Sequence, residues 1–335
     1  MLELQEPHGA FEILEGYLAE ELRDGVAVDV YLGYGLSEVL RRKRGPAPPE
    51  PCPLPLLAAR ARPANEPVEP ARGSFAVGEW RPSWAEADYA AAVTEARAAI
   101  ARGDVYQVNL VQHLSAAFEG EPQALAAALA PLAPLHPRPF GGEGWAIVSA
   151  SPELFLSRRG PMLRTQPIKG TRPLGEPVQG AKDTAEHVMI VDLERNDLAR
   201  VCTVGSVRWP ELMAQHELAG VSHLVSTVEG RLRDGVGLAE ILQATFPGGS
   251  ITGAPKIAAV DEIARLEPVG RGASMGALGT VHANGDFDFA LTIRTFAVAD
   301  GTIHLWVGGG IVWDSDPLAE IEESWVKARP LLAAV

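Results

Sequence analysis

Apolar residues along the chain recur at two spacings, every three to four residues and every second residue, which predict helices and strands respectively. Helical spacing is clear after Ser83-Trp84-Ala85-Glu86, which is typical of a capping box at a helix start, and Gly103 ends this helix. Strand alternation follows at once in VYQVNLVQ, residues 105–112. Further helices are predicted over 184–198, 237–244, 255–266 and 317–329, and further strands at GWAIVSA, ELFLS, LTIRTFAV and TIHLWVGGGIV. Because helices and strands are interspersed without a regular βαβ period, we expect an α+β fold.

Prolines indicate how the chain is divided. Residues 46–70 hold nine of the 27 prolines, a density typical of a linker or a loosely packed arm. We therefore expect a short N-terminal segment at 1–45, a proline-rich linker or arm at 46–80, and a main body at 81–335.

Composition narrows the classes of partner. No apolar run approaches the roughly 20 residues of a membrane span, and the N-terminus lacks the features of a signal peptide, so we expect a cytoplasmic protein without a membrane partner. The net charge of −14 argues against nucleic acid as a partner, and the one basic run, Arg41–Arg44, is interpreted as a solvated loop. The two cysteines indicate neither a disulfide framework nor a zinc site.

Carboxylates on two predicted helices allow two interpretations each. In the last helix, Glu320, Glu323 and Lys327 share one face. The opposite face carries apolar side chains: Leu318, Ile321, Trp325 and Ala328. The acidic face is typical of a solvated surface with a Glu323–Lys327 pair, but it could also hold a hard divalent cation, with the lysine reaching an anionic ligand. Glu186 likewise either stabilises a helix start or adds a third metal ligand.

Two glycine-rich stretches could bring the backbone close to a ligand. FPGGSITGAPK, residues 246–256, lacks the Gly-Lys-Ser/Thr order of a phosphate loop, so backbone N–H groups offered to a carboxylate fit better. GGGIV, residues 308–312, either lets a ligand approach the backbone or forms a bulge at a strand end. His223, in HLVSTVEG, would by itself more often be a core histidine than a catalytic one.

Together and in order, these stretches resemble the chorismate-utilising enzymes. The resemblance runs from about Trp84 to Arg329 and rests on nine segments: GDVYQVNL, SASPELF, PIKGTRPLG, EHVMIVDLERNDLARV, HLVSTVEG, FPGGSITGAPK, LTIRTF, GGGIVWDSDP and AEIEESWVKA. It implies a sandwich of two packed β-sheets flanked by helices, with the active site between the sheets.

The resemblance also implies a reaction. Lys169, in TQPIKGTRPLG, resembles the lysine of aminodeoxychorismate synthases, at a position where anthranilate synthases carry alanine. It implies amination of chorismate at C4 through a covalent lysine adduct, which yields 4-amino-4-deoxychorismate for para-aminobenzoate and folate synthesis. Glu153 resembles the acid that protonates the departing hydroxyl. The ammonia would come from a separate glutamine amidotransferase, since neither cysteine sits in a glycine-flanked elbow.

Further site residues are implied by their positions in the matching segments. Glu186, Glu320 and Glu323 resemble the ligands of a magnesium ion. The implied contacts to chorismate are Gln107, Gly170, Thr171, His223, Thr252, Gly253, Arg294, Gly309, Gly310 and Lys327. Gln107 stands where the members that add water carry a lysine, and a neutral amide cannot act as that base.

Two other functions stay open at this point. An anthranilate synthase component I, which converts chorismate to anthranilate and pyruvate, is the nearest alternative. A catalytically silent homologue that serves only as a binding subunit is the other, although the joint presence of Lys169, Glu153, Glu186 and Glu323 argues against it.

Overall fold

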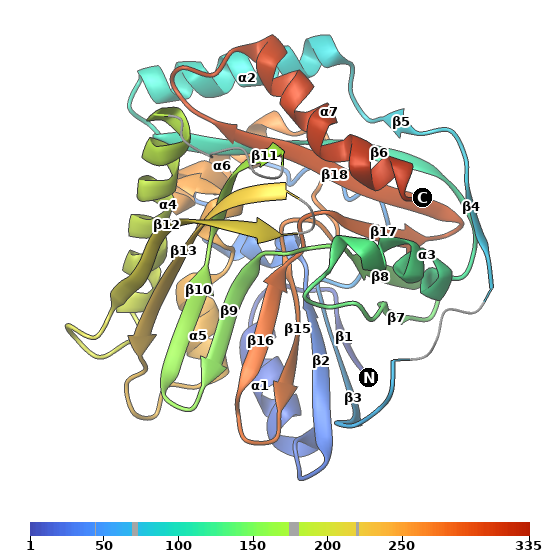
Figure 1. Ribbon diagram of the computed structural model, residues 1–335, viewed down its shortest axis with the longest axis vertical. Helices are drawn as coiled ribbons and strands as arrows, with labels where there is room; N and C mark the ends of the chain where they lie inside the picture. The colour runs from blue at the N-terminus through green and yellow to red at the C-terminus, as the bar shows by residue number, and fades with distance from the viewer. Residues whose placement is uncertain (44, 69–72, 174–180, 219–220) are drawn as a thin grey trace.

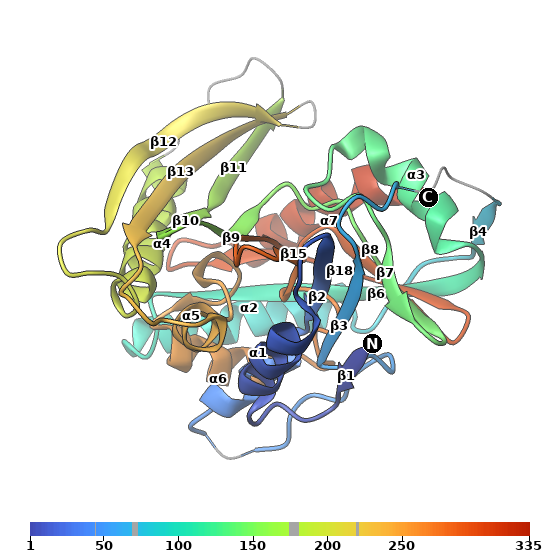
Figure 2. The same ribbon diagram turned by 90° about the horizontal axis from the view of Figure 1, so that it is seen from below.

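The structure, a computed structural model, describes residues 1–43, 45–68, 73–173, 181–218 and 221–335. In this part of the chain, two antiparallel sheets are flanked by helices, which confirms the predicted α+β class (Figures 1 and 2). Of the described strands, ten form the larger sheet and eight the smaller one.

The larger sheet begins and ends with strands from the first and middle parts of the chain. Its strands are β1 (Leu2–Leu4), β2 (Val26–Leu32), β3 (Leu57–Pro63), β9 (Leu154–Arg159), β10 (Met162–Gln166), β11 (Ile168–Pro173), β12 (Arg208–Leu218), β13 (Val221–Arg231), β15 (Ala277–His282) and β16 (Phe287–Leu291). They follow the order β1-β3-β2-β15-β16-β9-β10-β13-β11, and β12 also pairs with β13.

The smaller sheet is built around two long strands that pair along their length. Its strands are β4 (Phe75–Val77), β5 (Arg81–Pro82), β6 (Gln107–Gly120), β7 (Phe140–Gly142), β8 (Trp145–Ser149), β14 (Gly253–Ala254), β17 (Thr295–Ala299) and β18 (Thr302–Ile311). Strand β18 pairs with β6 from Thr302 opposite Ala117 to Ile311 opposite Val108.

Helices cover both sheets. They are α1 (Ala10–Glu21), α2 (Glu86–Ala101), α3 (Pro122–Leu129), α4 (Ala181–Ala199), α5 (Leu238–Thr245), α6 (Lys256–Leu266) and α7 (Pro317–Ala333). Helix α4 packs on β11 and β13, α7 packs on β18 with α2 beside it, and α6 packs on β6 (Figure 1). None of the described helices combines the length and the apolar composition needed to cross a membrane.

Most predicted elements after residue 105 are confirmed within a few residues, but the capping box is wrong. Helix α2 begins at Glu86, and no side chain caps its N-terminus. The Ser83 N–H donates to the carbonyl of His113 on β6 at 2.9 Å, and its hydroxyl lies 2.5 Å from His113 Nδ1. Ser83 therefore extends the edge of the smaller sheet, where sheet contacts override the local helix-start pattern.

The predicted strand LTIRTFAV is interrupted. Strand β16 ends at Leu291 in the larger sheet, and β17 begins at Thr295 in the smaller one. Arg294 lies between them with φ +49°, in the left-handed region that few non-glycine residues adopt. The chain thus passes from one sheet to the other at Arg294.

Helix α7 begins as predicted and buries Ile321 and Ala328 of the predicted apolar face, but not Leu318. Asp316 caps it by accepting from the N–H groups of Leu318 and Ala319, each at 3.0 Å. Leu318, predicted to face the core, is 73% exposed, whereas Glu320 is only 3% exposed. The buried face consists of Glu320, Ile321, Ser324, Ala328 and Leu331. The Ser315 hydroxyl donates to Glu320 at 2.6 Å, which helps this carboxylate to tolerate burial.

The first part of the chain supplies three strands of the larger sheet. Strand β2 pairs with β15 from the main body, β3 pairs with β2, and β1 pairs with β3. Strand β3 falls within residues 46–80, the stretch predicted to be a linker or arm. Six prolines of this stretch, at 46–55, precede the strand. That part of the predicted linker is a paired strand, while the division at 1–45, 46–80 and 81–335 stays a prediction.

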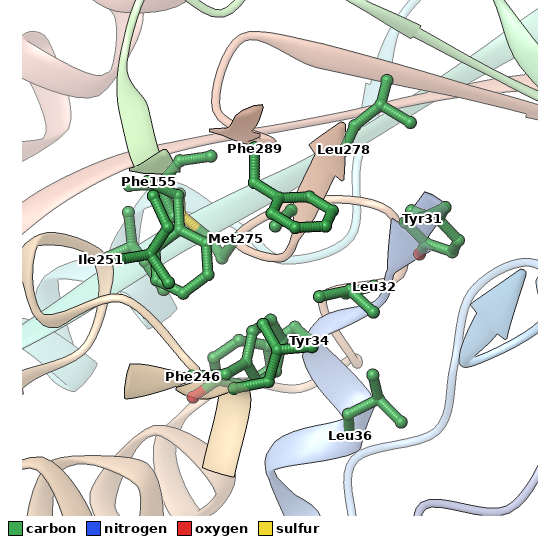
Figure 3. Close-up of a cluster of buried hydrophobic side chains, with 14 of the residues drawn as sticks. Tyr31, Leu32, Tyr34, Leu36, Phe155, Phe246, Ile251, Met275, Leu278 and Phe289 are labelled. Atoms are coloured by element: carbon green, nitrogen blue, oxygen red, sulfur yellow. The ribbon is translucent and has the colours of Figure 1, made fainter. Parts of the chain in front are cut away.

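A cluster of buried side chains joins the N-terminal strands to the segments around the predicted site. Figure 3 shows ten of its labelled members: Tyr31, Leu32, Tyr34, Leu36, Phe155, Phe246, Ile251, Met275, Leu278 and Phe289. The rings of Phe155 and Phe246 meet edge to face, with centroids 6.1 Å apart. Because Ile251 belongs to this cluster, the segment FPGGSITGAPK is fixed to the core.

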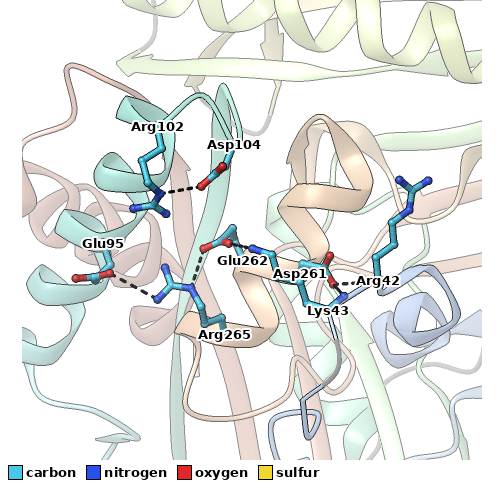
Figure 4. Close-up of polar contacts among 8 residues, drawn as sticks. All are labelled: Arg42, Lys43, Glu95, Arg102, Asp104, Asp261, Glu262 and Arg265. Atoms are coloured by element: carbon cyan, nitrogen blue, oxygen red, sulfur yellow. Dashed lines mark hydrogen bonds and ion pairs between the residues drawn. The ribbon is translucent and has the colours of Figure 1, made fainter.

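The basic run is more than a solvated loop. The backbone N–H groups of Arg42 and Lys43 donate to Asp261 on α6, and the Lys43 ammonium pairs with Glu262 at 2.5 Å (Figure 4). Arg265, on the same helix, also pairs with Glu262 at 2.8 Å. Arg42 and Lys43 are exposed and lie outside any helix or strand, as predicted for a solvated loop, and these contacts also join the N-terminal part of the chain to α6.

Candidate active site

Lys169 and Glu153 meet at a short 3-10 turn, Gly249–Ile251, which lies before β14. Lys169 comes from β11, and its Nζ donates to the Ser250 carbonyl oxygen at 3.3 Å. Glu153 precedes β9, is 4% exposed, and accepts a hydrogen bond from Ser250 Oγ at 2.7 Å. A lysine amine and a buried carboxyl group are thus held by the two polar groups of one serine.

Burial sets the proton affinity of Glu153. Desolvation raises its pKa above the ordinary value, because the charged form is disfavoured away from water. The Ser250 hydroxyl and the positive charges of Lys169 and Arg294 oppose this rise without cancelling it. Arg294 is half-buried where the chain passes between the sheets. Burial lowers the pKa of Arg294, and the charge of Glu153 only partly offsets this. A raised pKa keeps more of the Glu153 carboxyl protonated, the form that can donate a proton.

Two histidines flank this pair. His223, on β13, is 1% exposed, and its Nδ1 lies 2.7 Å from the Gly170 carbonyl oxygen, so Nδ1 carries the proton. Burial lowers the pKa of His223. His187, on α4, lies 2.6 Å through Nε2 from Ser226 Oγ, and burial together with the charge of Lys169 lowers its pKa to about 4. Both imidazoles are therefore neutral near pH 7.

A second group of predicted residues gathers where α7 lies against the glycine run of β18. The Lys327 ammonium donates to Glu323 Oε1 at 2.8 Å and to the Gly308 carbonyl oxygen at 2.9 Å. A Cβ added to Gly309 would lie 3.2 Å from Glu323 Oε1, 3.2 Å from Lys327 Nζ and 3.6 Å from Glu320 Oε2. Two carboxyl groups and an ammonium thus converge above a strand that carries no side chain at that position.

Gln107 connects this second group to β6. It is fully buried, and neither its amide nitrogen nor its amide oxygen has a hydrogen-bond partner within the described residues. A Cβ added to Gly310 would lie only 2.5 Å from Gln107 Nε2, so the amide packs directly on the glycine run. Buried amides without partners are uncommon and are one mark of a site that takes a polar ligand.

The three carboxylates predicted to bind metal come from two helices. Glu186 lies half-buried on α4, whereas Glu320 and Glu323 lie together on α7. Among the residues that the structure describes, no group of three or more His, Cys, Asp or Glu side chains could hold a metal ion. Two carboxylates still match what magnesium requires, since it is often held by one or two carboxylates plus oxygens of its ligand.

Of the remaining predicted residues, Thr252 and Gly253 follow the Gly249–Ile251 turn, and Thr171 is described only in its backbone. Thr252 is fully buried, and its hydroxyl donates to the Gly248 carbonyl oxygen at 2.9 Å. Gly253 lies in β14 opposite Val108 of β6. Thr171 belongs to β11, and its side chain lies outside the described residues.

Sequence reasoning did not single out Ser250 or His187. Ser250 stands inside the glycine-rich stretch and His187 follows Glu186, but neither position has a spacing that indicates its contacts. Ser250 meets residues 81 and 97 positions away in the chain. Only the pairing of distant strands brings these groups together.

Comparison with known proteins places this chain in a family. The family model described as chorismate binding enzyme matches residues 43–333. The chain is 40% identical over 316 residues to anthranilate synthase component 1 of Streptomyces coelicolor, covering 90% of this chain and 59% of that protein. It is 39% identical over 278 residues to aminodeoxychorismate synthase component 1 of Bacillus subtilis, covering 78% of this chain and 57% of that protein.

A solved structure agrees with these matches. Anthranilate synthase component I from Streptococcus pneumoniae superposes with a TM-score of 0.82 at 26% identity, covering 95% of this chain and 85% of that one. The chain spans less than three fifths of the length of the two curated relatives above. Because the family model matches most of the length of this chain, the chain belongs to the chorismate binding enzyme family.

Proposed function

We propose that this chain is the synthase component of an aminodeoxychorismate synthase, which aminates chorismate at C4. Overall sequence similarity does not separate this activity from that of anthranilate synthase. The aminodeoxychorismate synthase component 1 matches at 39% identity and the anthranilate synthase component 1 at 40%. The observation that carries the proposal is the placement of Lys169. Its amine lies on Ser250, whose hydroxyl holds the buried Glu153 carboxyl, so a nucleophile and an acid face the same turn.

In the proposed reaction, two additions replace one direct displacement at C4. The Lys169 nitrogen forms a bond to C2 of chorismate through its lone pair while the ring double bonds shift and the C4 hydroxyl departs. Glu153 gives this hydroxyl a proton, so it leaves as water. Ammonia then forms a bond to C4, and the bond between Lys169 and C2 breaks. In this second step the Lys169 nitrogen leaves C2 as a free amine, and the new ammonium at C4 gives one proton back to the Glu153 carboxylate. The product released is 4-amino-4-deoxychorismate.

The groups around the turn and the glycine run suit a dianionic substrate. We assign Arg294, the Gly309–Gly310 backbone and Lys327 to its carboxylates, because these groups offer positive charge or N–H donors. Gln107 has a buried amide that can hydrogen-bond a bound ligand. The ammonia is proposed to come from a separate glutamine amidotransferase subunit, in keeping with relatives that are each named as a component 1.

Magnesium is proposed as the cofactor, held by Glu320 and Glu323 together with a carboxylate of chorismate; whether Glu186 joins them on binding stays a prediction. When bound, the ion would supply positive charge that fixes this carboxylate. We expect a chelator to abolish activity and magnesium to restore it. Glu323→Gln is expected to weaken magnesium binding and chorismate binding by roughly tenfold or more each, because the Glu323 carboxylate and a carboxylate of chorismate would bind the same ion.

Titration calorimetry of magnesium with and without chorismate measures this coupling apart from turnover. Glu322→Gln is the matched control, because Glu322 is exposed and pairs with Arg329 on the same helix. Full activity in excess chelator, or equal binding by the Glu323 and Glu322 variants, would show that these carboxylates do not bind the metal.

The identity of the product tests the proposed function directly. The chain is incubated with chorismate, magnesium and an ammonium salt, and the products are separated by chromatography. We expect 4-amino-4-deoxychorismate, which an added lyase converts to 4-aminobenzoate. Anthranilate with an equal amount of pyruvate would instead identify an anthranilate synthase.

A further inference from the structure

Glu194 is a buried acid on α4 to which the proposed reaction gives no role. It is 2% exposed, and its Oε1 accepts a hydrogen bond from the Gly249 N–H at 2.9 Å. Its Oε2 is buried without a hydrogen-bond partner in the described part of the chain. A carboxyl oxygen left unsatisfied in the interior destabilises the fold. The contact with Gly249 is thus kept although burial of this acid destabilises the fold.

The contact of Glu194 leads directly to the pair at Ser250. Gly249 precedes Ser250 in the 3-10 turn, so a shift of the Gly249 amide also moves the hydroxyl and the carbonyl of Ser250. A Cβ added to Gly249 would lie 2.7 Å from Leu193 Cδ2 and 3.0 Å from Glu194 Oε1. Helix α4 is thus in close contact with the turn, and only a glycine there leaves the Glu194 bond undisturbed.

We propose that Glu194 is a positioning residue that fixes this turn through the Gly249 N–H. With the turn fixed, Ser250 meets Glu153 with its hydroxyl and Lys169 with its carbonyl at the same time. The inference rests on the proposed function for the roles of Glu153 and Lys169.

The groups that face Glu194 make its effect depend on pH. Burial first, then the charge of Asp197 one turn along α4, raise the pKa of Glu194 to about 7, and Glu153 adds to the rise. Lys256 and the Gly249 N–H act in the opposite direction, and Lys256 also pairs with Asp197 at 2.5 Å. Above this pKa the carboxylate holds Gly249 by a charge-assisted bond, which weakens when the group takes up a proton.

Two substitutions and a control test this inference. Glu194→Leu removes the acceptor at similar volume, Glu194→Gln keeps an acceptor that cannot ionise, and Asp192→Asn changes an exposed acid of the same helix. Total consumption of chorismate with magnesium and ammonium is followed from about pH 6 to 8, whichever product forms. We expect Glu194→Leu to lower kcat roughly 10- to 100-fold with little change in KM, because misplaced reacting groups slow the chemistry.

The conservative variant separates positioning from simple loss of structure. Glu194→Gln is expected to stay within about fivefold of the unaltered chain at pH 8 and to lose the rise in kcat through pH 7. Wild-type kinetics for Glu194→Leu, or a Glu194→Gln profile that keeps this rise, would overturn the inference. If Glu194→Leu does not fold, the profile of Glu194→Gln decides. Anthranilate as the product would contradict the proposed function but leave this test intact, since consumption is measured.

Discussion

Lys169→Ala is expected to abolish the covalent adduct and to lower amination at C4 by roughly a thousandfold or more, as loss of a nucleophile does elsewhere. Without the amine, ammonia must displace the C4 hydroxyl directly, and the easier two-step route is lost. The adduct is measured by mass spectrometry of the chain quenched with chorismate and magnesium but no ammonia. The peptide that contains Lys169 should gain the mass of chorismate minus water.

Lys43→Ala is the control for this experiment, since the Lys43 ammonium is largely exposed and binds Glu262 away from the turn. It should form the adduct and the product like the unaltered chain.

Lys169→Arg should lower amination at C4 further than Lys169→Ala does. A guanidinium stays protonated, and it also fills the space that alanine would leave open. In the alanine variant, C2 is open to ammonia, and entry there would give anthranilate as the product. An adduct on another residue, or undiminished amination at C4, would show that Lys169 has only a structural or electrostatic role.

Local patterns predicted most elements of the main body because periodicity reports which positions are buried. Helices α4, α5 and α6 and strands β6, β8, β9 and β18 lie where that periodicity places them. The errors arise where distant contacts decide. Ser83 joins a sheet edge, Arg294 carries the chain between two sheets, and α7 buries Glu320 in place of Leu318. None of these outcomes is encoded in the spacing of neighbouring residues.

The candidate site was predictable as residue types and segments, and much less as a geometry. Lys169 and Glu153 stood out through the resemblance to a family, and the structure places them on the two polar groups of Ser250. The carboxylates show the limit of such reasoning. Helical spacing places Glu320 and Glu323 on one face of the last helix, but only the fold shows that this face lies over the glycine run of β18. Glu194 escaped notice because helical spacing does not reveal which loop a side chain meets.

Glu153→Gln is expected to lower chorismate turnover by roughly 100- to 10,000-fold, the usual range for a general acid. Adduct formation on Lys169 should slow by a similar factor, because the hydroxyl leaves in that same step. The amide of glutamine is close in size to the carboxyl group and can still accept from Ser250, so the fold should be retained. Quenched-flow measurement of the adduct separates this effect from weaker binding of chorismate.

The pH dependence of turnover then tests whether Glu153 is the acid. Glu153 acts in its protonated form, so kcat/KM should fall as pH rises through its pKa, which burial has raised. The Ser250 hydroxyl favours the charged form. Ser250→Ala should therefore raise this pKa further and move the descending limb to higher pH, although the carbonyl that holds Lys169 remains. Ser206→Ala, at a partly exposed serine whose hydroxyl donates to the Thr203 carbonyl oxygen, should leave the limb in place. An unmoved limb in Ser250→Ala, or a limb that persists in Glu153→Gln, would show that another group donates the proton.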